Sequence, residues 1–170
     1  MVETDDIHDT TPPRLDTYVK EGDLVYVSQF NNGDELVENI RMATFLANHT
    51  QENVFVLPLI QPTLKDATKL RNELFPNGVK KNKNPDYYFR KRFLDAKCMN
   101  ESVPSTKKLT KRNIQNRLKE AFAQADDAFL EIPVTYPLSW VKDAVKGKLK
   151  SSSNQHIVYV RYGDSLLTFE

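Results

Sequence analysis

Short apolar segments alternate with segments of helical periodicity along this chain, and that alternation constrains the fold more than any other feature of the sequence. Residues 54–60 form a continuous apolar run of the length of a buried strand, and residues 128–133 have a similar content. Apolar residues recur at helical spacing over residues 35–48 and 111–126, and Thr110 is a reasonable cap for the second of these helices. We therefore expect a single α/β domain over residues 16–170.

Turn signals and caps divide the rest of the chain into further elements. A strand over residues 23–30 is expected to end at the turn 31–33, and Asp34 is a suitable N-cap for the helix that follows. Residues 1–15 contain two prolines and almost no periodicity, so we expect a flexible leader there. Three further elements are expected. They are a polar, helical stretch over residues 63–75, a helix over residues 138–149, and a terminal hairpin formed by residues 156–162 and 165–169.

Charge is divided unevenly along the chain, although the formal net charge is only +1. Residues 1–79 carry 6 basic and 13 acidic residues, which gives −7. Residues 80–119 carry 13 basic and 3 acidic residues, which gives +10, and residues 120–170 carry 5 and 7, which gives −2. A +10 block in a nearly neutral chain is typical of a surface that binds a polyanion such as a nucleic acid; a solvated charged face is the alternative.

Several classes of protein are excluded by composition. No apolar run approaches the roughly 20 residues that a transmembrane helix needs, so we expect no membrane partner. The acidic amino terminus lacks the apolar region of a standard secretory signal. Cys98 is the single cysteine, which excludes an intrachain disulfide and a cysteine-based zinc cluster and favours a reducing compartment.

A predicted hairpin carries the most informative side chains. Two β-like runs, 85–89 and 93–99, are separated by three basic residues, and this spacing predicts a hairpin with a basic tip. Because residues two apart on a strand share a face, Asp95 and Lys97 should project together, and the hairpin can bring Asp86 beside them. Close carboxylates favour a cation between them, and their hard oxygens suit Mg²⁺ or Mn²⁺. The pattern predicts a divalent-ion site at which Lys97 assists attack on a phosphate.

The pattern Pro85-Asp86 followed by Asp95-Ala96-Lys97 resembles the signature of the PD-(D/E)xK nuclease superfamily. The resemblance implies a restriction-endonuclease-like core, in which a central mixed β-sheet is flanked by helices. It also implies a glutamate from the preceding helix, and Glu38 stands at the matching position. Glu35, one helical turn earlier, could serve equally.

The order of elements over residues 24–133 resembles, more narrowly, the C-terminal tRNA nuclease domains of contact-dependent growth inhibition toxins. A long insertion between Pro58 and Pro85 departs from that pattern. The resemblance implies tRNA as substrate and Mg²⁺ or Mn²⁺ as cofactor, with Zn²⁺ as a further candidate. It also implies an acidic immunity protein as partner, and action in the cytoplasm after delivery into a target bacterial cell as part of a larger secreted protein.

Together these observations give the hypothesis of a metal-dependent endonuclease acting on structured RNA. Its catalytic residues would be Glu38, Asp86, Asp95 and Lys97, of which the three carboxylates hold the metal. The candidate substrate-binding residues are basic or amide side chains: Lys83, Arg90, Lys91, Arg92, Lys108, Lys111, Arg112 and Gln124.

Two alternatives to this hypothesis stay open. One is a DNA endonuclease of the same superfamily, and the other is a non-catalytic nucleic-acid or protein-binding module on the same fold. Tyr87 and Tyr88 could stack on an unpaired base or pack in the interior, and strand alternation predicts that one of them faces inward.

Overall fold

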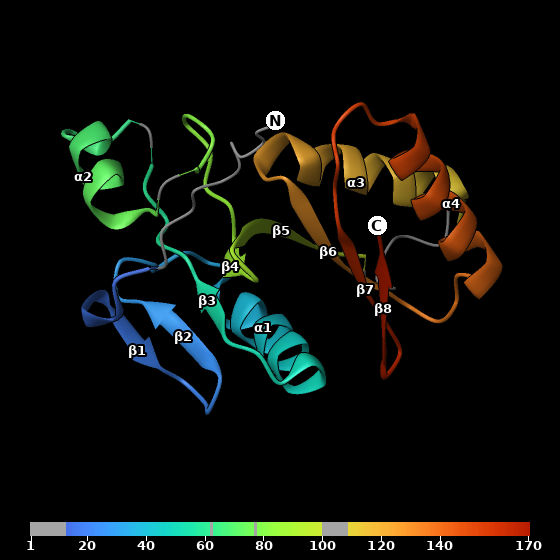
Figure 1. Ribbon diagram of the computed structural model, residues 1–170, viewed down its shortest axis with the longest axis horizontal. Helices are drawn as coiled ribbons and strands as arrows, with labels where there is room; N and C mark the ends of the chain where they lie inside the picture. The colour runs from blue at the N-terminus through green and yellow to red at the C-terminus, as the bar shows by residue number, and fades with distance from the viewer. Residues whose placement is uncertain (1–12, 62, 77, 100–108) are drawn as a thin grey trace, which may run out of the picture. The chain divides into compact units, whose positions relative to one another are not determined.

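A computed structural model describes residues 13–61, 63–76, 78–99 and 109–170. Most of the expected leader, residues 1–12, lies outside the described residues. The chain has the α/β fold that the sequence predicts, with mixed strand pairing and flanking helices (Figure 1). Residue contacts divide it into two compact units, one ending at Leu94 and one beginning at Asp95.

The first unit contains a βαβ arrangement. Strands β2 (Val25–Ser28) and β3 (Val54–Val56) pair in parallel, and helix α1 (Leu36–Thr50) connects them and packs against both. The elements of this unit are η1 (Leu15–Thr17), β1 (Tyr18–Lys20), β2 (Val25–Ser28), α1 (Leu36–Thr50), β3 (Val54–Val56), α2 (Ala67–Leu74), β4 (Tyr87–Phe89) and the start of β5 (Arg92–Cys98). Strand β1 pairs antiparallel with β2, and β4 pairs antiparallel with both β3 and β5. The sequence did not predict η1 or β1, and the strands expected over 23–30 and 54–60 are shorter than predicted.

Aromatic rings fill much of the interior of the first unit. The Phe55 ring stacks on Tyr26 at 5.1 Å and meets Tyr18 edge-on at 5.6 Å. Tyr88 contacts Phe55 at 5.9 Å and Phe93 at 5.6 Å, so the rings continue from strand to strand. Edge-to-face and offset pairs of this kind add stability beyond the area they bury. Burial also raises the pKa of the Tyr18 hydroxyl, because the phenolate would lose its hydration.

The start of α1 differs from the expectation. Glu35, not Asp34, is the N-cap, and its side chain makes no capping hydrogen bond. At the other end, Gln51 adopts a left-handed conformation (φ 57°) and its N–H donates to the Ala47 carbonyl at 2.7 Å. An apolar side of α1, including Met42 and Leu46, is buried, so packing holds this helix in the absence of a side-chain cap.

The second unit has an aliphatic interior. Thr110 is the N-cap of helix α3 (Lys111–Gln124), as expected. Its hydroxyl accepts a hydrogen bond from the Asn113 N–H at 3.1 Å. Helix α4 (Leu138–Ser151) connects the parallel strands β6 (Asp127–Ile132) and β7 (Val158–Tyr162). Helices α3 and α4 pack against each other, and Leu118 of α3 and Val141 of α4 are buried in the hydrophobic core of this unit. The elements of this unit are the rest of β5, α3, β6 (Asp127–Ile132), α4 (Leu138–Ser151), β7 (Val158–Tyr162) and β8 (Ser165–Phe169).

Both expected hairpins are present. Strands β4 and β5 pair with Tyr88 opposite Phe93, and β7 pairs with β8 around Gly163. The β4–β5 turn is shorter than expected, because Arg92 already lies in β5 opposite Phe89. No helix in the described part of the chain is long and apolar enough to cross a membrane.

Candidate functional site

Asp95 and Lys97 form an ion pair on β5. The Lys97 ammonium lies 3.0 Å from Oδ2 of Asp95, which confirms that the two side chains share one face of the strand. The Asp95 side chain is only 5% exposed, whereas that of Lys97 is 28% exposed. Burial of a carboxylate is costly unless opposite charge or hydrogen bonds compensate, and Lys97 supplies that charge. The pair therefore combines a buried anion with a cation that reaches the surface.

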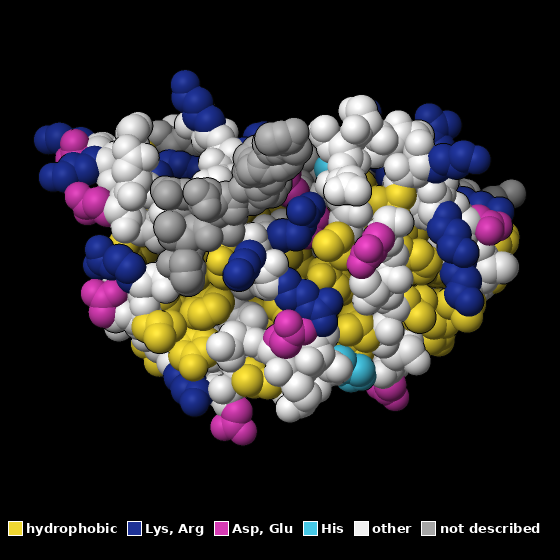
Figure 2. All heavy atoms as spheres, in the orientation of Figure 1, with side chains coloured by type: hydrophobic (Ala, Val, Ile, Leu, Met, Phe, Trp, Pro, Cys, Tyr) yellow, Lys and Arg dark blue, Asp and Glu magenta, His cyan; other side chains and the backbone are white. Residues whose placement is uncertain are grey.

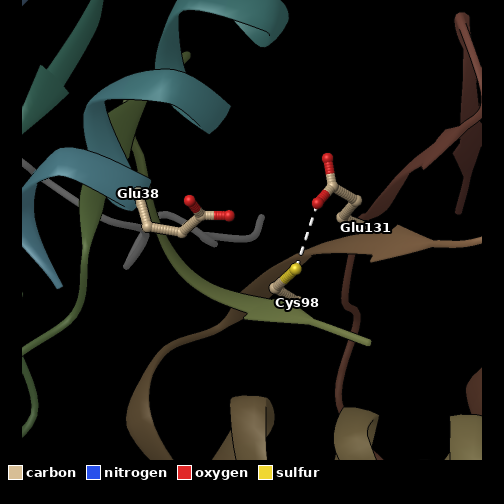
Figure 3. Close-up of side chains that lie close together, drawn as sticks. All are labelled: Glu38, Cys98 and Glu131. Carbon is tan, nitrogen blue, oxygen red and sulfur yellow. Dashed lines mark hydrogen bonds between the residues drawn. The ribbon is translucent and has the colours of Figure 1, made fainter. Parts of the chain in front are cut away.

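Glu131 on β6 lies among polar groups of the second unit. The Cys98 thiol donates to Oε1 of Glu131 at 3.0 Å, and Figure 3 shows this contact as a dashed line. Arg161, opposite Glu131 in the β6–β7 register, places Nη1 3.5 Å from Oε2. The Met99 N–H donates to the Glu131 carbonyl at 2.8 Å, which ties the end of β5 to β6.

Sequence reasoning missed this arrangement of Cys98, Glu131 and Arg161. Each residue is unremarkable in its own segment, and only the parallel pairing of β6 with β7 sets Glu131 opposite Arg161, 30 positions away. The arrangement neutralises a partly buried carboxylate, and none of the three was proposed as a catalytic group.

Asp86 lies in the first unit at the entry to β4. Its N–H donates to the carbonyl of Leu94 at 2.9 Å, and its own carbonyl accepts from the Leu57 N–H at 3.0 Å. The Asn39 side-chain amide donates to Oδ1 of Asp86 at 3.3 Å, and the Asn39 carbonyl accepts from the Tyr87 hydroxyl at 2.7 Å. Asn39, which sequence reasoning did not single out, thus contacts the Asp86 carboxylate directly.

A pocket of about 450 Å³ adjoins Asp86. It is lined by polar groups around the start of α1, including the side chains of Asp34, Glu35 and Asn39. Carboxylate and amide oxygens on this lining are ligands of the kind that hard divalent cations prefer. Glu35, the alternative to Glu38 in the sequence analysis, is therefore the helix glutamate that shares a pocket with Asp86.

Glu38, which Figure 3 also labels, is a residue of α1. Its Oε1 accepts from Nε of Arg41 at 3.1 Å and pairs with the same guanidinium through Nη2. Its side chain is 47% exposed. Glu38 and Asp86 belong to the first unit and Asp95 and Lys97 to the second, so the structure brings one predicted pair together and the convergence of all four stays a prediction.

The basic tip of the β4–β5 hairpin is present, but one of its side chains, Arg90, makes intramolecular contacts. Arg90 and Lys91 both have positive φ, 53° and 63°, as a two-residue hairpin turn requires. Arg90 Nε donates to Glu52 at 2.7 Å, and its guanidinium lies over the Phe89 ring at 5.0 Å. Lys91 is exposed at the turn, so it is better placed than Arg90 to contact a substrate.

The other candidate substrate-binding residues differ in their surroundings. Lys83 and Arg92 are half-buried in the first unit. In the second unit, Lys111 pairs with Asp143 at 3.0 Å and Arg112 is exposed at the start of α3. Two candidates remain: Gln124, half-buried as the last residue of α3, and Lys108, which lies outside the described residues.

The expectation that only one of Tyr87 and Tyr88 faces inward is wrong. Their exposures are 0% and 5%. The Tyr87 hydroxyl bonds to Asn39 in the interior, while the Tyr88 ring packs among the aromatic residues of the first unit. Both faces of β4 are therefore covered, and neither tyrosine can stack on a base without leaving the core.

Comparison with known proteins yields no relative. No family model matches the chain, no curated protein sequence matches it, and no solved structure matches its fold. The site has to be interpreted from its own chemistry.

Proposed function

We propose that the chain is a divalent-metal-dependent endonuclease that hydrolyses phosphodiester bonds of structured RNA, with tRNA as the favoured substrate. The observation that carries the proposal is the buried Asp95 carboxylate, 3.0 Å from the ammonium of Lys97. Metal-dependent nuclease chemistry uses an anionic oxygen ligand for the metal and a cation close to the scissile phosphate, and Asp95 and Lys97 offer groups of both kinds.

The donor atoms available at the proposed site fit Mg²⁺ or Mn²⁺. Asp95 in the second unit and Asp86 in the first unit each offer carboxylate oxygens, which suit hard cations, whereas Zn²⁺ usually takes nitrogen or sulfur ligands. Both carboxylates are at least partly withdrawn from solvent, which limits competition from water. A metal held by Asp95 would polarise a phosphoryl oxygen and make a water ligand more acidic.

Lys97 is the proposed partner of the reacting phosphate. Its ammonium can hold a phosphate oxygen or orient the attacking water, because part of its side chain reaches the surface while Asp95 fixes its direction. Glu38 fits less well as a metal ligand, since it does not line the pocket beside Asp86. Glu35 is the better candidate for the contribution of α1, because it lines the pocket beside Asp86.

The preference for RNA, and the biological setting, are proposed on the resemblance to growth-inhibition toxin domains. In that setting the chain would be delivered into a target bacterial cell, act in its cytoplasm and be neutralised by an acidic immunity protein. An acidic partner suits the +10 block, because opposite potentials steer association.

The proposal is tested by incubating the purified chain with tRNA and with duplex DNA, each with Mg²⁺, Mn²⁺ or EDTA. We expect tRNA cleavage with Mg²⁺ or Mn²⁺ and none with EDTA. Cleavage of DNA alone would replace the RNA proposal by a DNA endonuclease, and intact substrates under every condition would exclude an enzyme of either kind.

Two isosteric variants test the residues. Asp95→Asn should reduce cleavage at least about a hundredfold, because the amide lacks the negative charge that attracts a divalent cation. Asp143→Asn is the matched control, because Asp143 also lies 3.0 Å from a lysine but is 62% exposed, and its cleavage rate should stay within about twofold. Circular dichroism confirms that both variants are folded. Equal activity in folded Asp95→Asn would remove Asp95 from the site.

A further inference from the structure

A second pocket of the first unit lies between α2 and the loop that follows it. Its volume is about 450 Å³. The polar residues lining it are Thr68, Arg71, Asn72, Lys80, Lys81 and Asn82. The described lining residues include three cations and no carboxylate, so the pocket carries a formal charge of +3. Figure 2 shows Lys and Arg side chains in dark blue over α2 and this loop, with a few Asp and Glu side chains among them.

Arg71 binds the loop that forms one side of this pocket. Its Nη1 donates to Oδ1 of Asn84 at 3.0 Å, and its Nη2 donates to the carbonyls of Lys80, at 3.4 Å, and Lys83. The guanidinium also lies over the Phe75 ring at 4.7 Å. Burial lowers the Arg71 pKa, but a guanidinium stays protonated at neutral pH, so Arg71 keeps its charge beside the pocket while it fixes the loop.

The loop has a defined shape of its own. Gly78 (φ 104°) and Asn82 (φ 60°) adopt left-handed conformations, which redirect the chain on either side of Lys80 and Lys81. The side-chain amide of Asn84 donates to the Ile60 carbonyl at 3.1 Å, and its Oδ1 accepts from the Ile60 N–H at 3.2 Å. The two lysines are therefore presented from an anchored loop.

The charge of the pocket outweighs the field of the helix beside it. The carboxyl end of α2 carries a partial charge of about −0.5, which disfavours an anion, but three full positive charges exceed it. Asp66, the N-cap of α2, and Glu73 line an adjoining pocket that shares Thr68 and Asn72 with this one and that also contains the cation Lys69. An anion entering beside Lys81 meets a net attraction.

We infer that this pocket binds the phosphodiester backbone of the nucleic-acid substrate, as a subsite on the first unit in addition to Asp95 and Lys97 on the second. This inference rests on the substrate class of the proposed function. The pocket lies in the insertion between Pro58 and Pro85, which thereby acquires a role in substrate binding.

A polymer suits the pocket better than a single phosphate ion. Three lining residues are exposed to solvent: Lys81, Asn82 and Asn72. Because water hydrates and screens exposed groups, their contacts with a single small anion would add little binding free energy. A nucleic acid adds the counterion release of many contacts, and each exposed cation along its path contributes.

The experiment measures binding of the full chain to labelled tRNA by fluorescence anisotropy, in EDTA, over a series of salt concentrations. Lys81→Glu should weaken binding about tenfold at low salt and reduce the slope of log K against log salt by about one unit, because one phosphate contact is lost. Lys20→Glu is the matched control, since Lys20 is also exposed in the first unit but lies on β1. Its affinity should stay within about threefold and its slope should not change. Lys81→Arg keeps the charge and should retain both wild-type values.

The outcomes separate this inference from the proposed function. Wild-type affinity and slope in Lys81→Glu would overturn the subsite even if the chain cuts tRNA. Equal losses in Lys81→Glu and Lys20→Glu would also overturn it, because they would show a general charge effect. The predicted losses in Lys81→Glu, together with uncut tRNA and DNA under every metal condition, would support the subsite and reject the nuclease.

Discussion

Two ion pairs of the second unit have the same geometry in different surroundings. Lys97 lies 3.0 Å from Asp95, and Lys111 lies 3.0 Å from Asp143. In the first pair the carboxylate is 5% exposed, and in the second it is 62% exposed. The comparison shows that distance alone does not identify a functional pair, because water screens the second and not the first.

Burial also changes how an ion pair contributes to the stability of the protein. An exposed pair contributes little and is tolerated almost anywhere. A buried carboxylate has a desolvation cost that its partner only offsets, so an apolar residue would often be as stable at that position. The stability of the fold alone therefore does not account for the buried Asp95, and the proposed function depends on this residue.

The largest expected effect comes from breaking the buried pair on one side. Lys97→Met removes the positive charge beside a buried carboxylate and should lower the free energy of unfolding by about 3 kcal/mol. This value is at the low end for buried pairs because Lys97 is 28% exposed. Urea denaturation at neutral pH measures it. A loss below about 1 kcal/mol would make the Asp95–Lys97 pair equivalent to a surface pair.

A smaller effect is expected when both partners are neutralised. The double variant Asp95→Asn/Lys97→Met leaves no buried charge, so it should be more stable than Lys97→Met alone, with a net loss of about 1–2 kcal/mol. Urea denaturation of the two single variants and the double variant completes the cycle. If the double variant is less stable than Lys97→Met, the carboxylate of Asp95 is held by groups other than Lys97.

The smallest effect is expected at the exposed pair. Lys111→Met should change the free energy of unfolding by about 0.2–1 kcal/mol at low salt. At about 1 M salt the difference should vanish, because the Debye length falls to about 3 Å. Thermal unfolding at the two salt concentrations provides the measurement. A difference that persists in high salt would show that the Lys111–Asp143 pair is not screened by salt and behaves as a buried pair does.

Local features of the fold were accessible from the sequence. The β4–β5 hairpin follows from two β-like runs with a short basic connection, and the pairing of Asp95 with Lys97 follows from strand alternation. Thr110 was predicted as a cap because a hydroxyl before a helix satisfies an orphan N–H. The prediction of Asp34 as the N-cap of α1 is wrong, because the helix begins at Leu36 and Glu35 is its N-cap, without a side-chain capping hydrogen bond.

Other features could not be predicted because they depend on residues far apart in the chain. Nothing near Asn39 in the sequence indicates that it bonds Asp86, 47 positions later. The burial of both Tyr87 and Tyr88 overrides strand alternation, because both faces of β4 are covered. Glu35 and not Glu38 lines the pocket beside Asp86, and only the position of the start of α1 decides between them.

The sequence by itself therefore determined the α/β class, the hairpin and the Asp95–Lys97 pair, because periodicity and i,i+2 spacing are properties of a few neighbouring residues. Only the tertiary structure decided that Asp95 is buried while Asp143 is exposed, and that Arg71 anchors the loop that carries Lys81. Burial and long-range hydrogen bonding depend on which segments meet, and single-segment patterns do not encode that information.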